Sequence, residues 1–348
     1  MANKKNPDWP AIAASFVAQI SHVDLHQAAM LRARDEYLRE SRRGGRPSRW
    51  TLAFSGGADS LALLLLFWAE GPGRWGRDFV VLHFNHRLRG KAADADEKFC
   101  RAVCAALKVK LVVGRWTKAP GKGASEAEAR AARLDFFQRA MKRQKSRLLW
   151  LAHQQDDIAE SMLMRLARGS GAGGLAAPRP VQAFADGRLH LRPMLTLKKP
   201  AIMTALRKAG ATWCEDATNL SGEFHRNRVR QSVVPAWIEA SGRDAQAGAA
   251  LSRDLIEEDD AALERWADQS GLLKRGSVDV RGCKQFPRAV VRRIIHRWLL
   301  AVRPETDLSR QGFGLLLAAV ERGQDTRFSL GGGFAVIRQG RLRYRATA

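Results

Sequence analysis

The sequence predicts an α/β fold in which a parallel, doubly wound sheet is followed by a mostly helical region and a small C-terminal α/β domain. Two observations support this prediction. Short segments are apolar throughout, as strands buried on both faces of a parallel sheet are. A helical pattern follows each of them, which predicts right-handed crossovers between parallel strands. The alternation begins at residue 51 and stops after Arg168.

The predicted strands and helices alternate in order along the chain. The strands are expected at 51–54, 79–84, 110–114 and 147–153, and the helices at 58–70, 94–107, 124–143 and 155–168. In sheets of this kind, ligands bind outside the carboxyl ends of the strands. The residues that follow each strand are therefore the first candidates for a functional site.

The regions on either side of this alternation are expected to be mainly helical. An amphipathic helix at about 23–41 leads into a basic connector, and a glycine-rich surface loop follows Arg168. Later helices are expected at 198–209, 228–240, 244–268, 287–302 and 308–322, with a β-hairpin at 328–346. We divide the chain into 1–48, an N-terminal helix and connector; 49–230, the α/β domain; and 231–348, a helical linker and C-terminal domain.

The charge of the chain favours a nucleic-acid partner. Its 348 residues include 59 lysines and arginines against 35 aspartates and glutamates, a formal net charge of +24. Such a surplus attracts phosphate backbones, although a proteome rich in arginine would give a similar count. Four cysteines without a CxxC pair argue against a disulfide framework or a zinc site, and no apolar run has membrane-spanning length. We expect a reduced, cytoplasmic protein.

The segment Phe54–Ser60, FSGGADS, has the composition of a phosphate-binding loop. It follows a predicted strand and opens a helix. Its glycines let the backbone approach an anion, and its hydroxyls and helix amides can donate to phosphate. The carboxylate of Asp59 would repel phosphate unless a cation lay between them, which indicates Mg²⁺. The residues expected to bind a nucleotide are Ser55, Gly56, Gly57, Ala58, Asp59 and Ser60.

Three further groups of polar residues are candidates for the site. One follows the second strand and is expected to point into the ligand crevice: Asn85, His86, Arg87 and Arg89. A second, on one face of the helix at 124–143, either clamps a phosphate or pairs with nearby acids: Arg130 and Arg133. The third either contacts RNA phosphates or forms a solvated charged surface: Arg226, Arg228 and Arg230.

His153, Asp157 and Glu160 follow the fourth strand and share one face at the start of a helix, because they are spaced at i, i+4 and i+7. Two carboxylates on one face complement a cation and can accept a proton from an attacking amine. The alternative is a metal site of a hydrolase made by the same three side chains. Asp156 is expected only to cap the helix.

These motifs, in this order, resemble those of the tRNA(Ile)-lysidine synthetase family of PP-loop ATP pyrophosphatases. SGGxDS is common to many PP-loop enzymes, and NHRLR, ARAAR, RPML and EDATN add to the resemblance. More specific is the combination of HQQDDIAES (153–161), RGSGAGGL (168–175) and RNRVR (226–230). The resemblance covers 51 to about 230, and the tail from 285 is more weakly like the family's first C-terminal domain. Leu134 and Thr218 depart from the family pattern, which usually has Tyr and Ser there.

The resemblance implies an ATP-dependent ligase that acts on the wobble cytidine in the CAU anticodon of isoleucine tRNA. The C2 oxygen of cytosine would attack the α-phosphorus of ATP and release pyrophosphate, and free L-lysine would then displace AMP to give lysidine. ATP and Mg²⁺ are the implied cofactors, 49–230 the catalytic domain, and 231–348 the region that includes a tRNA-binding domain. A short form of the family is expected, and a homodimer is permitted.

The resemblance also implies roles for the candidate residues. Asp59 would hold Mg²⁺, and Arg130 or Arg133 would stabilise the charge on the α-phosphorus. His153 would position the phosphate or take up a proton. The implied lysine-binding residues are Asp157 and Glu160, and the implied tRNA contacts are Arg226, Arg228 and Arg230.

Three other functions remain open at this point. A PP-loop tRNA thiolase that inserts sulfur into an anticodon-region pyrimidine is the nearest alternative, but it commonly needs a CxxC pair that the sequence lacks. A non-catalytic RNA-binding protein would not need the polar motif residues. An amide-forming ligase for a small metabolite would not need the charge of +24.

Overall fold

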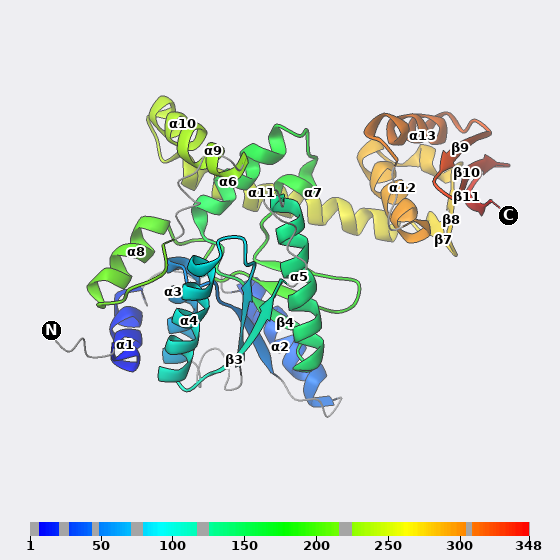
Figure 1. Ribbon diagram of the computed structural model, residues 1–348. Helices are drawn as coiled ribbons and strands as arrows, with labels where there is room; N and C mark the ends of the chain where they lie inside the picture. The colour runs from blue at the N-terminus through cyan, green and yellow to red at the C-terminus, as the bar shows by residue number, and fades with distance from the viewer. Residues whose placement is uncertain are drawn as a thin grey trace. The chain divides into compact units, whose positions relative to one another are not determined.

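The computed structural model describes residues 7–20, 28–43, 49–70, 79–116, 125–215, 225–303 and 308–347 (Figure 1). The chain forms two compact units, Met1–Asp254 and Leu255–Ala348. The boundary between them falls within the long helix α11 (Ala245–Gln269). The division at residue 230 that the sequence suggested stays a prediction.

A six-stranded sheet forms the centre of the first unit, in the order β3-β2-β1-β4-β6-β5. Its strands are β1 (Trp50–Ala53), β2 (Phe79–Asn85), β3 (Lys110–Arg115), β4 (Leu148–Trp150), β5 (Val181–Ala183) and β6 (Leu189–Leu191). All neighbouring strands are parallel except β5 and β6. The doubly wound sheet is therefore confirmed. Along the chain, β2 and β3 are added on one side of β1, and β4 is added on its other side. A ligand crevice is expected at this reversal, between β1 and β4.

Helices cover both faces of this sheet (Figure 1). Four helices share a core with Leu52, Val81 and Trp150 on one face: α1 (Trp9–Ile20), α3 (Ala58–Glu70), α4 (Lys91–Ala106) and α8 (Lys199–Lys208). On the other face, α5 (Glu126–Arg143) shares a smaller core with Leu82. Successive residues of one strand thus enter different cores, which explains why the strands are apolar throughout.

Several short elements differ from the sequence prediction. The helix α1 and the antiparallel pair β5–β6 were not expected, and the glycine-rich segment after Arg168 contains the short helix α7 (Ala172–Leu175). The described part of the helix predicted at about 23–41 is α2 (Ala28–Arg43). The helix predicted at 228–240 is divided into α9 (His225–Arg228), a π-helical turn (Val229–Val233) and α10 (Val234–Ser241).

The second unit has its own core and its own sheet. The helices α12 (Arg288–Val302) and α13 (Arg310–Arg322) share this core with a five-stranded antiparallel sheet. Its strands are β7 (Leu273–Lys274), β8 (Ser277–Asp279), β11 (Arg341–Ala346), β10 (Gly333–Arg338) and β9 (Thr326–Leu330), in that spatial order. The predicted hairpin is therefore part of a larger sheet. Among the helices of the described ranges, none is long and apolar enough to cross a membrane.

Gly114 in β3 allows α5 to lie close to the sheet. A Cβ atom on Gly114 would lie 2.3 Å from Cδ2 of Phe136, which is far inside van der Waals contact. The ring of Phe136 stacks on that of Phe84, with centroids 5.4 Å apart, so it cannot move without losing this contact. The position therefore requires glycine for packing.

We expect Gly114→Ala to lower the free energy of unfolding by about 1–3 kcal/mol, because the added methyl group overpacks this contact. Gly248→Ala is the matched control, since Gly248 lies in α11 with open space around it. That change should raise the free energy of unfolding by up to about 1 kcal/mol through helix propensity. Urea unfolding of both variants measures the difference, and equal stabilities would contradict the prediction.

Candidate active site

Two segments that follow neighbouring strands lie at the same edge of the sheet. The loop from Phe54 follows β1, and the residues from Leu151 follow β4 and lead into α6 (Gln155–Leu166). The amide of Phe54 donates to the carbonyl of Leu82 (2.9 Å), and the amide of Leu151 donates to that of Leu191 (2.9 Å). The predicted phosphate loop and the predicted acidic helix are thereby brought together at the carboxyl ends of β1 and β4.

Hydrogen bonds within the loop fix its shape. The hydroxyl of Ser60 accepts from the amide of Ser55 (3.1 Å) and donates to the carbonyl of Gly57 (3.0 Å). The two serine hydroxyl oxygens lie 3.0 Å apart. Because α3 begins at Ala58, its first amides also lie at this edge, where they can donate to an anion.

Gly56 is the residue of the loop that packing and conformation both restrict. Its φ is +93°, in the region that favours glycine. A Cβ atom would lie 3.1 Å from Sγ of Cys214 and 3.2 Å from Sγ of Cys100. Its carbonyl also accepts from the amide of Cys214 (3.0 Å). A larger residue would therefore displace the loop from α4 and from the segment at Cys214.

Asp59 lies at the start of α3 among charges of both signs. The pKa of Asp59 is raised from 3.8 to about 6, mainly by burial. The positive charges of Lys199 and Arg230 oppose this shift, and the negative charges of Asp157 and Asp156 contribute to it. One of its oxygens, Oδ1, is buried and has no hydrogen-bond partner. A buried carboxylate that is left unsatisfied in this way favours a bound cation.

A magnesium ion fits this carboxylate. Mg²⁺ typically takes one or two protein carboxylates and completes its coordination with phosphate oxygens and water. Within the described residues, no three His, Cys, Asp or Glu side chains are grouped so that they could hold a metal by themselves. This finding argues against the alternative metal site at His153, Asp157 and Glu160.

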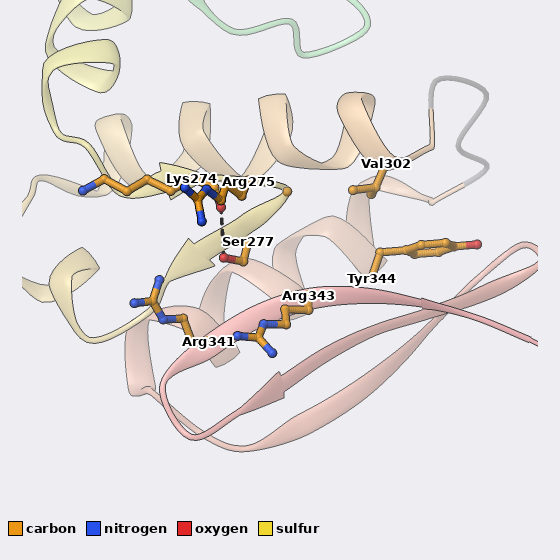
Figure 2. A pocket seen from close by; sticks show the side chains of 8 residues that line it. Lys274, Arg275, Ser277, Val302, Arg341, Arg343 and Tyr344 are labelled. Atoms are coloured by element: carbon orange, nitrogen blue, oxygen red, sulfur yellow. Dashed lines mark hydrogen bonds between the residues drawn. The ribbon is translucent and has the colours of Figure 1, made fainter.

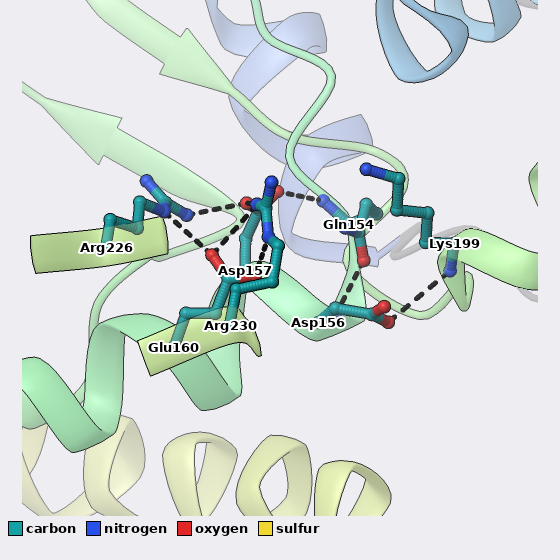
Figure 3. Close-up of polar contacts among 7 residues, drawn as sticks. All are labelled: Gln154, Asp156, Asp157, Glu160, Lys199, Arg226 and Arg230. Carbon is teal, nitrogen blue, oxygen red and sulfur yellow. Dashed lines mark hydrogen bonds and ion pairs between the residues drawn. The ribbon is translucent and has the colours of Figure 1, made fainter. Parts of the chain in front are cut away.

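The start of α6 is fixed by a capping box. The side chain of Gln154 accepts from the amide of Asp156 (2.6 Å), and the carboxylate of Asp157 accepts from the amide of Gln154 (2.9 Å). The capping role expected for Asp156 is therefore wrong, since Gln154 supplies the cap. The carboxylate of Asp156 instead accepts from the amide of Lys199 at 3.4 Å (Figure 3).

Asp157 and Glu160 form a four-residue acid–arginine cluster with Arg226 and Arg230 (Figure 3). Arg226 donates from Nη2 to Oδ1 of Asp157 (2.6 Å) and from Nε to Oε2 of Glu160 (2.7 Å). Arg230 donates to both carboxylate oxygens of Glu160, at 2.5 and 3.0 Å. The side chain of Glu160 is only 2% exposed, so these arginines neutralise a charge that would be costly to bury alone.

Arg228, the third predicted arginine, lies outside this cluster and is exposed. Arg226 and Arg230 are four residues apart and share a helical face, whereas Arg228 lies between them on another. Arg230 belongs to the π-helical turn Val229–Val233. Turns of this kind are rare and often occur at functional sites.

His153 lies near four arginines. Burial, together with the positive charges of Arg192, Arg226, Arg133 and Arg130, holds the pKa of His153 well below its usual value, so the imidazole is neutral at physiological pH. Its Nδ1 atom is buried and has no hydrogen-bond partner. The two candidate arginines of α5 are thus electrostatically close to the histidine, and the surroundings of this ring favour an anion.

The residues at the end of β2 and directly after it do not all face the crevice as expected. Asn85 is buried and donates to the carboxylates of Asp94 and Glu97, at 3.1 Å each, and Arg89 donates to Asp96 (2.5 Å). These contacts tie the end of β2 to α4, so a ligand-binding role for Asn85 and Arg89 is not supported. The EDATN motif lies mostly outside the described residues.

Two basic residues at this edge were missed in the sequence. Lys199, at the start of α8, is the positive charge that acts most strongly on Asp59. Arg192, directly after β6, is the charge that acts most strongly on His153. The sequence does contain a sign of Arg192, since this arginine lies in the otherwise apolar segment LHLRPML. No strand was predicted in that segment, so the position of Arg192 at the end of a strand was not recognised.

The PP-loop domain family matches residues 30–237 of the chain. Among curated relatives, the tRNA(Ile)-lysidine synthase of Geobacter sulfurreducens is 33% identical over 277 residues, which cover 76% of this chain and 57% of the relative. That of Symbiobacterium thermophilum is 33% identical over 291 residues, with 79% and 58% covered. The chain thus spans less than two thirds of the length of these relatives.

Similarity to solved structures is weaker. A U34-tRNA thiolase, NcsA, from Methanococcus maripaludis matches 64% of this chain and 80% of its own, with 14% identity and a TM-score of 0.47. Likeness at this level carries no functional conclusion.

We expect Asp59→Asn to stabilise the protein in the absence of nucleotide and Mg²⁺. Because the pKa of Asp59 is higher in the folded state than in the unfolded state, ionisation costs stability as the pH rises from about 4 to about 6. The gain in free energy of unfolding should therefore be about 1 kcal/mol larger at about pH 7.5 than at about pH 5. Urea unfolding at both pH values measures it.

The exposed Asp35 provides the control for this prediction, since its side chain is 52% exposed. Asp35→Asn should change stability little at either pH. If the increase in free energy of unfolding caused by Asp59→Asn became smaller as the pH rises, the conclusion that Asp59 is a buried, unsatisfied carboxylate would be wrong. The same variant should lose the stabilisation that Mg²⁺ and ATP give to the wild type.

Proposed function

This chain belongs to the PP-loop family, and on that premise we propose that it is an ATP-dependent tRNA-modifying ligase. The reaction is the ligation of free L-lysine to the wobble cytidine in the CAU anticodon of isoleucine tRNA, with release of AMP and pyrophosphate. The observation that carries the proposal is the meeting of the phosphate loop and the acid–arginine cluster at one edge of the sheet, after β1 and β4.

The first step activates the base. The C2 oxygen of cytosine attacks the α-phosphorus of ATP, the bond from this phosphorus to the bridging oxygen breaks, and pyrophosphate leaves. The hydroxyls of Ser55 and Ser60 and the first amides of α3 hold the phosphates. Asp59 would hold Mg²⁺, which would supply positive charge beside the phosphate oxygens. Arg130 or Arg133 stabilises the negative charge that develops on the α-phosphorus.

The second step needs a site for a cationic amino acid, and Asp157 and Glu160 are suited to it. In the structure their oxygens accept from Nε and Nη2 of Arg226 and Arg230, so a lysine ammonium group must take over some of these contacts. The arginine that is displaced can then contact an RNA phosphate, which joins the two roles expected for this cluster.

Lysine then attacks the activated base. Its ε-amine adds at C2 of the cytosine, the bond from C2 to the adenylate oxygen breaks, and AMP leaves. The attacking amine must lose a proton, and the neutral imidazole of His153 can accept it. The target base comes from a loop, so placing it in the crevice costs less than extruding a base from a duplex.

Sulfur transfer finds less support. Nucleophilic sulfur chemistry needs a thiolate or a persulfide. Burial raises the pKa of the Cys104 and Cys214 thiols to about 12 and raises that of Cys100 still further. These three thiols are therefore protonated at neutral pH, and we do not propose a thiolase.

The C-terminal unit offers a surface for RNA. A hollow of about 600 Å³ lies among the β7–β8 hairpin, β11 and the end of α12 (Figure 2). Four exposed basic side chains line it, and none of its eight lining residues is acidic: the four are Lys274, Arg275, Arg341 and Arg343. Residues 271–348 contain sixteen basic and five acidic residues. We assign this hollow to contacts with the phosphate backbone of the tRNA.

The proposed function predicts ATP-dependent incorporation of labelled lysine into unmodified isoleucine tRNA with a CAU anticodon. Asp157→Asn should raise the KM for lysine about 10- to 100-fold, because it removes a charged partner of the ammonium group while an amide oxygen still caps α6. Pyrophosphate release that depends on tRNA and ATP should change much less. Filter binding of labelled tRNA and a pyrophosphate assay measure the two steps.

Asp156→Asn is the control for this variant, because Asp156 lies next to Asp157 but outside the acid–arginine cluster. It should leave the KM for lysine nearly unchanged. No incorporation of lysine by the wild type would refute the ligase, and equal losses in both steps would refute the assignment of Asp157 to lysine.

The assignment of the C-terminal hollow predicts that Arg341→Glu/Arg343→Glu weakens tRNA binding at least about tenfold at about 0.15 M salt. The slope of log Kd against log salt concentration should also become shallower, by the amount that corresponds to the loss of about two phosphate contacts. Arg292→Glu/Arg322→Glu is the control, since it changes net charge equally at exposed helix positions outside the hollow. Equal losses in the two double variants would mean that only net charge matters. Fluorescence anisotropy with labelled tRNA measures both.

A further inference from the structure

Arg192 is a buried cation in the crevice to which the reaction described above gives no role. The residue is only 6% exposed. It follows β6, the parallel neighbour of β4, and thus lies at the same carboxyl edge as His153. Ligands of open parallel sheets bind at this edge.

The hydrogen bonds of Arg192 leave much of its guanidinium group unused. Nη1 donates to the carbonyl of Arg179 (2.8 Å) and Nη2 donates to Oε1 of Gln182 (2.8 Å). Its Nε atom is buried and has no hydrogen-bond partner. A guanidinium has five N–H donors, so these two bonds to neutral acceptors satisfy fewer than half of them.

The charge of Arg192 is also not balanced by a carboxylate. Among the described residues, no ion pair joins it to an acid, and its surroundings are mostly positive. Burial lowers the pKa of Arg192 to about 10, with Arg130 and Arg165 adding to the shift and Asp157 opposing it. The side chain remains protonated at neutral pH. A buried charge without a counter-ion is costly, which indicates that an anion completes the site.

The neighbours of Arg192 favour the same kind of ligand. The pKa of Arg165 is lowered by burial and by the positive charges of Arg130, Arg168 and Arg179, so several arginines of this region repel one another. His153, on which Arg192 acts most strongly, is neutral and has a buried, unpartnered Nδ1. An oxyanion between these groups would accept from the guanidinium and relieve the repulsion.

We propose that Arg192 is a further substrate-binding residue, which holds a phosphate group beside His153. The phosphate comes either from the nucleotide, as the α-phosphate, or from the RNA, as a phosphodiester next to the modified cytidine. The two sources have the same chemistry, and a guanidinium matches both as a planar, multidentate donor. This inference relies on the proposed function only for the identity of the RNA.

The test measures binding and not turnover. The dissociation constants of AMP and of a synthetic anticodon stem–loop with the CAU sequence are determined separately for the full chain and for Arg192→Gln. We expect Kd to rise about 10- to 100-fold for at least one probe. A loss confined to AMP assigns the nucleotide phosphate, and a loss confined to the stem–loop assigns the RNA phosphodiester. Arg192→Lys, which keeps the charge, should recover part of the affinity.

A purely structural role is tested with Gln182→Met, which removes the acceptor of Nη2 and keeps Arg192. This variant should bind both probes like the wild type, even if its melting temperature falls. Equal losses of affinity in Gln182→Met and Arg192→Gln would overturn the proposal, as would unchanged affinities in Arg192→Gln or a wild type that binds neither probe. Wild-type binding without lysine incorporation would refute the ligase and leave the role of Arg192 to be decided by these affinities.

Discussion

The pairing of β1 with β4 is the constraint on which the candidate site depends. Parallel hydrogen bonds align Trp50 with Leu148, and the buried hydroxyl of Thr51 donates to the carbonyl of Leu148 (2.6 Å). The indoles of Trp50 and Trp150 pack with their centroids 5.6 Å apart. Because both strands end at one edge, the phosphate loop and the start of α6 meet there, although about a hundred residues separate them in the sequence. A slip in this pairing would separate the phosphate loop from the carboxylates of α6.

The polar groups at this edge divide into two kinds. Asp157 and Glu160 are paired with arginines, and their pairing links α6 to the helical segment that begins at His225. Asp59, His153 and Arg192, by contrast, each keep a buried polar atom without a hydrogen-bond partner. Buried polar atoms in folded proteins are rarely left unsatisfied. The paired residues therefore link elements around the crevice, and the unpaired ones are where we propose that a cation and an anion bind.

Much of the fold could be predicted because its signals are local. The continuous apolar segments at 51–54 and 79–84 indicate strands that are buried on both faces. The Gly-Gly turn before α3 indicates that the backbone can approach an anion closely. The short strands β5 and β6 could not be predicted, since three residues show no periodicity. The acid–arginine cluster joins residues 66 to 70 positions apart, and no local pattern encodes such a pairing. Lys199 and Arg192 were missed because their roles depend on what the tertiary structure places beside them.

The sulfur atoms that pack against Gly56 have a consequence for the chemical durability of the protein. Cys100 and Cys214 lie against Gly56 of the phosphate loop, and burial keeps both thiols protonated. Peroxides and alkylating agents react with thiolates much faster than with thiols. The phosphate loop is thus packed against cysteines, which are among the side chains most easily oxidised. Both are held as neutral thiols, the form that reacts slowly with oxidants. Oxidation of this protein by peroxides should accordingly begin elsewhere than at its phosphate loop.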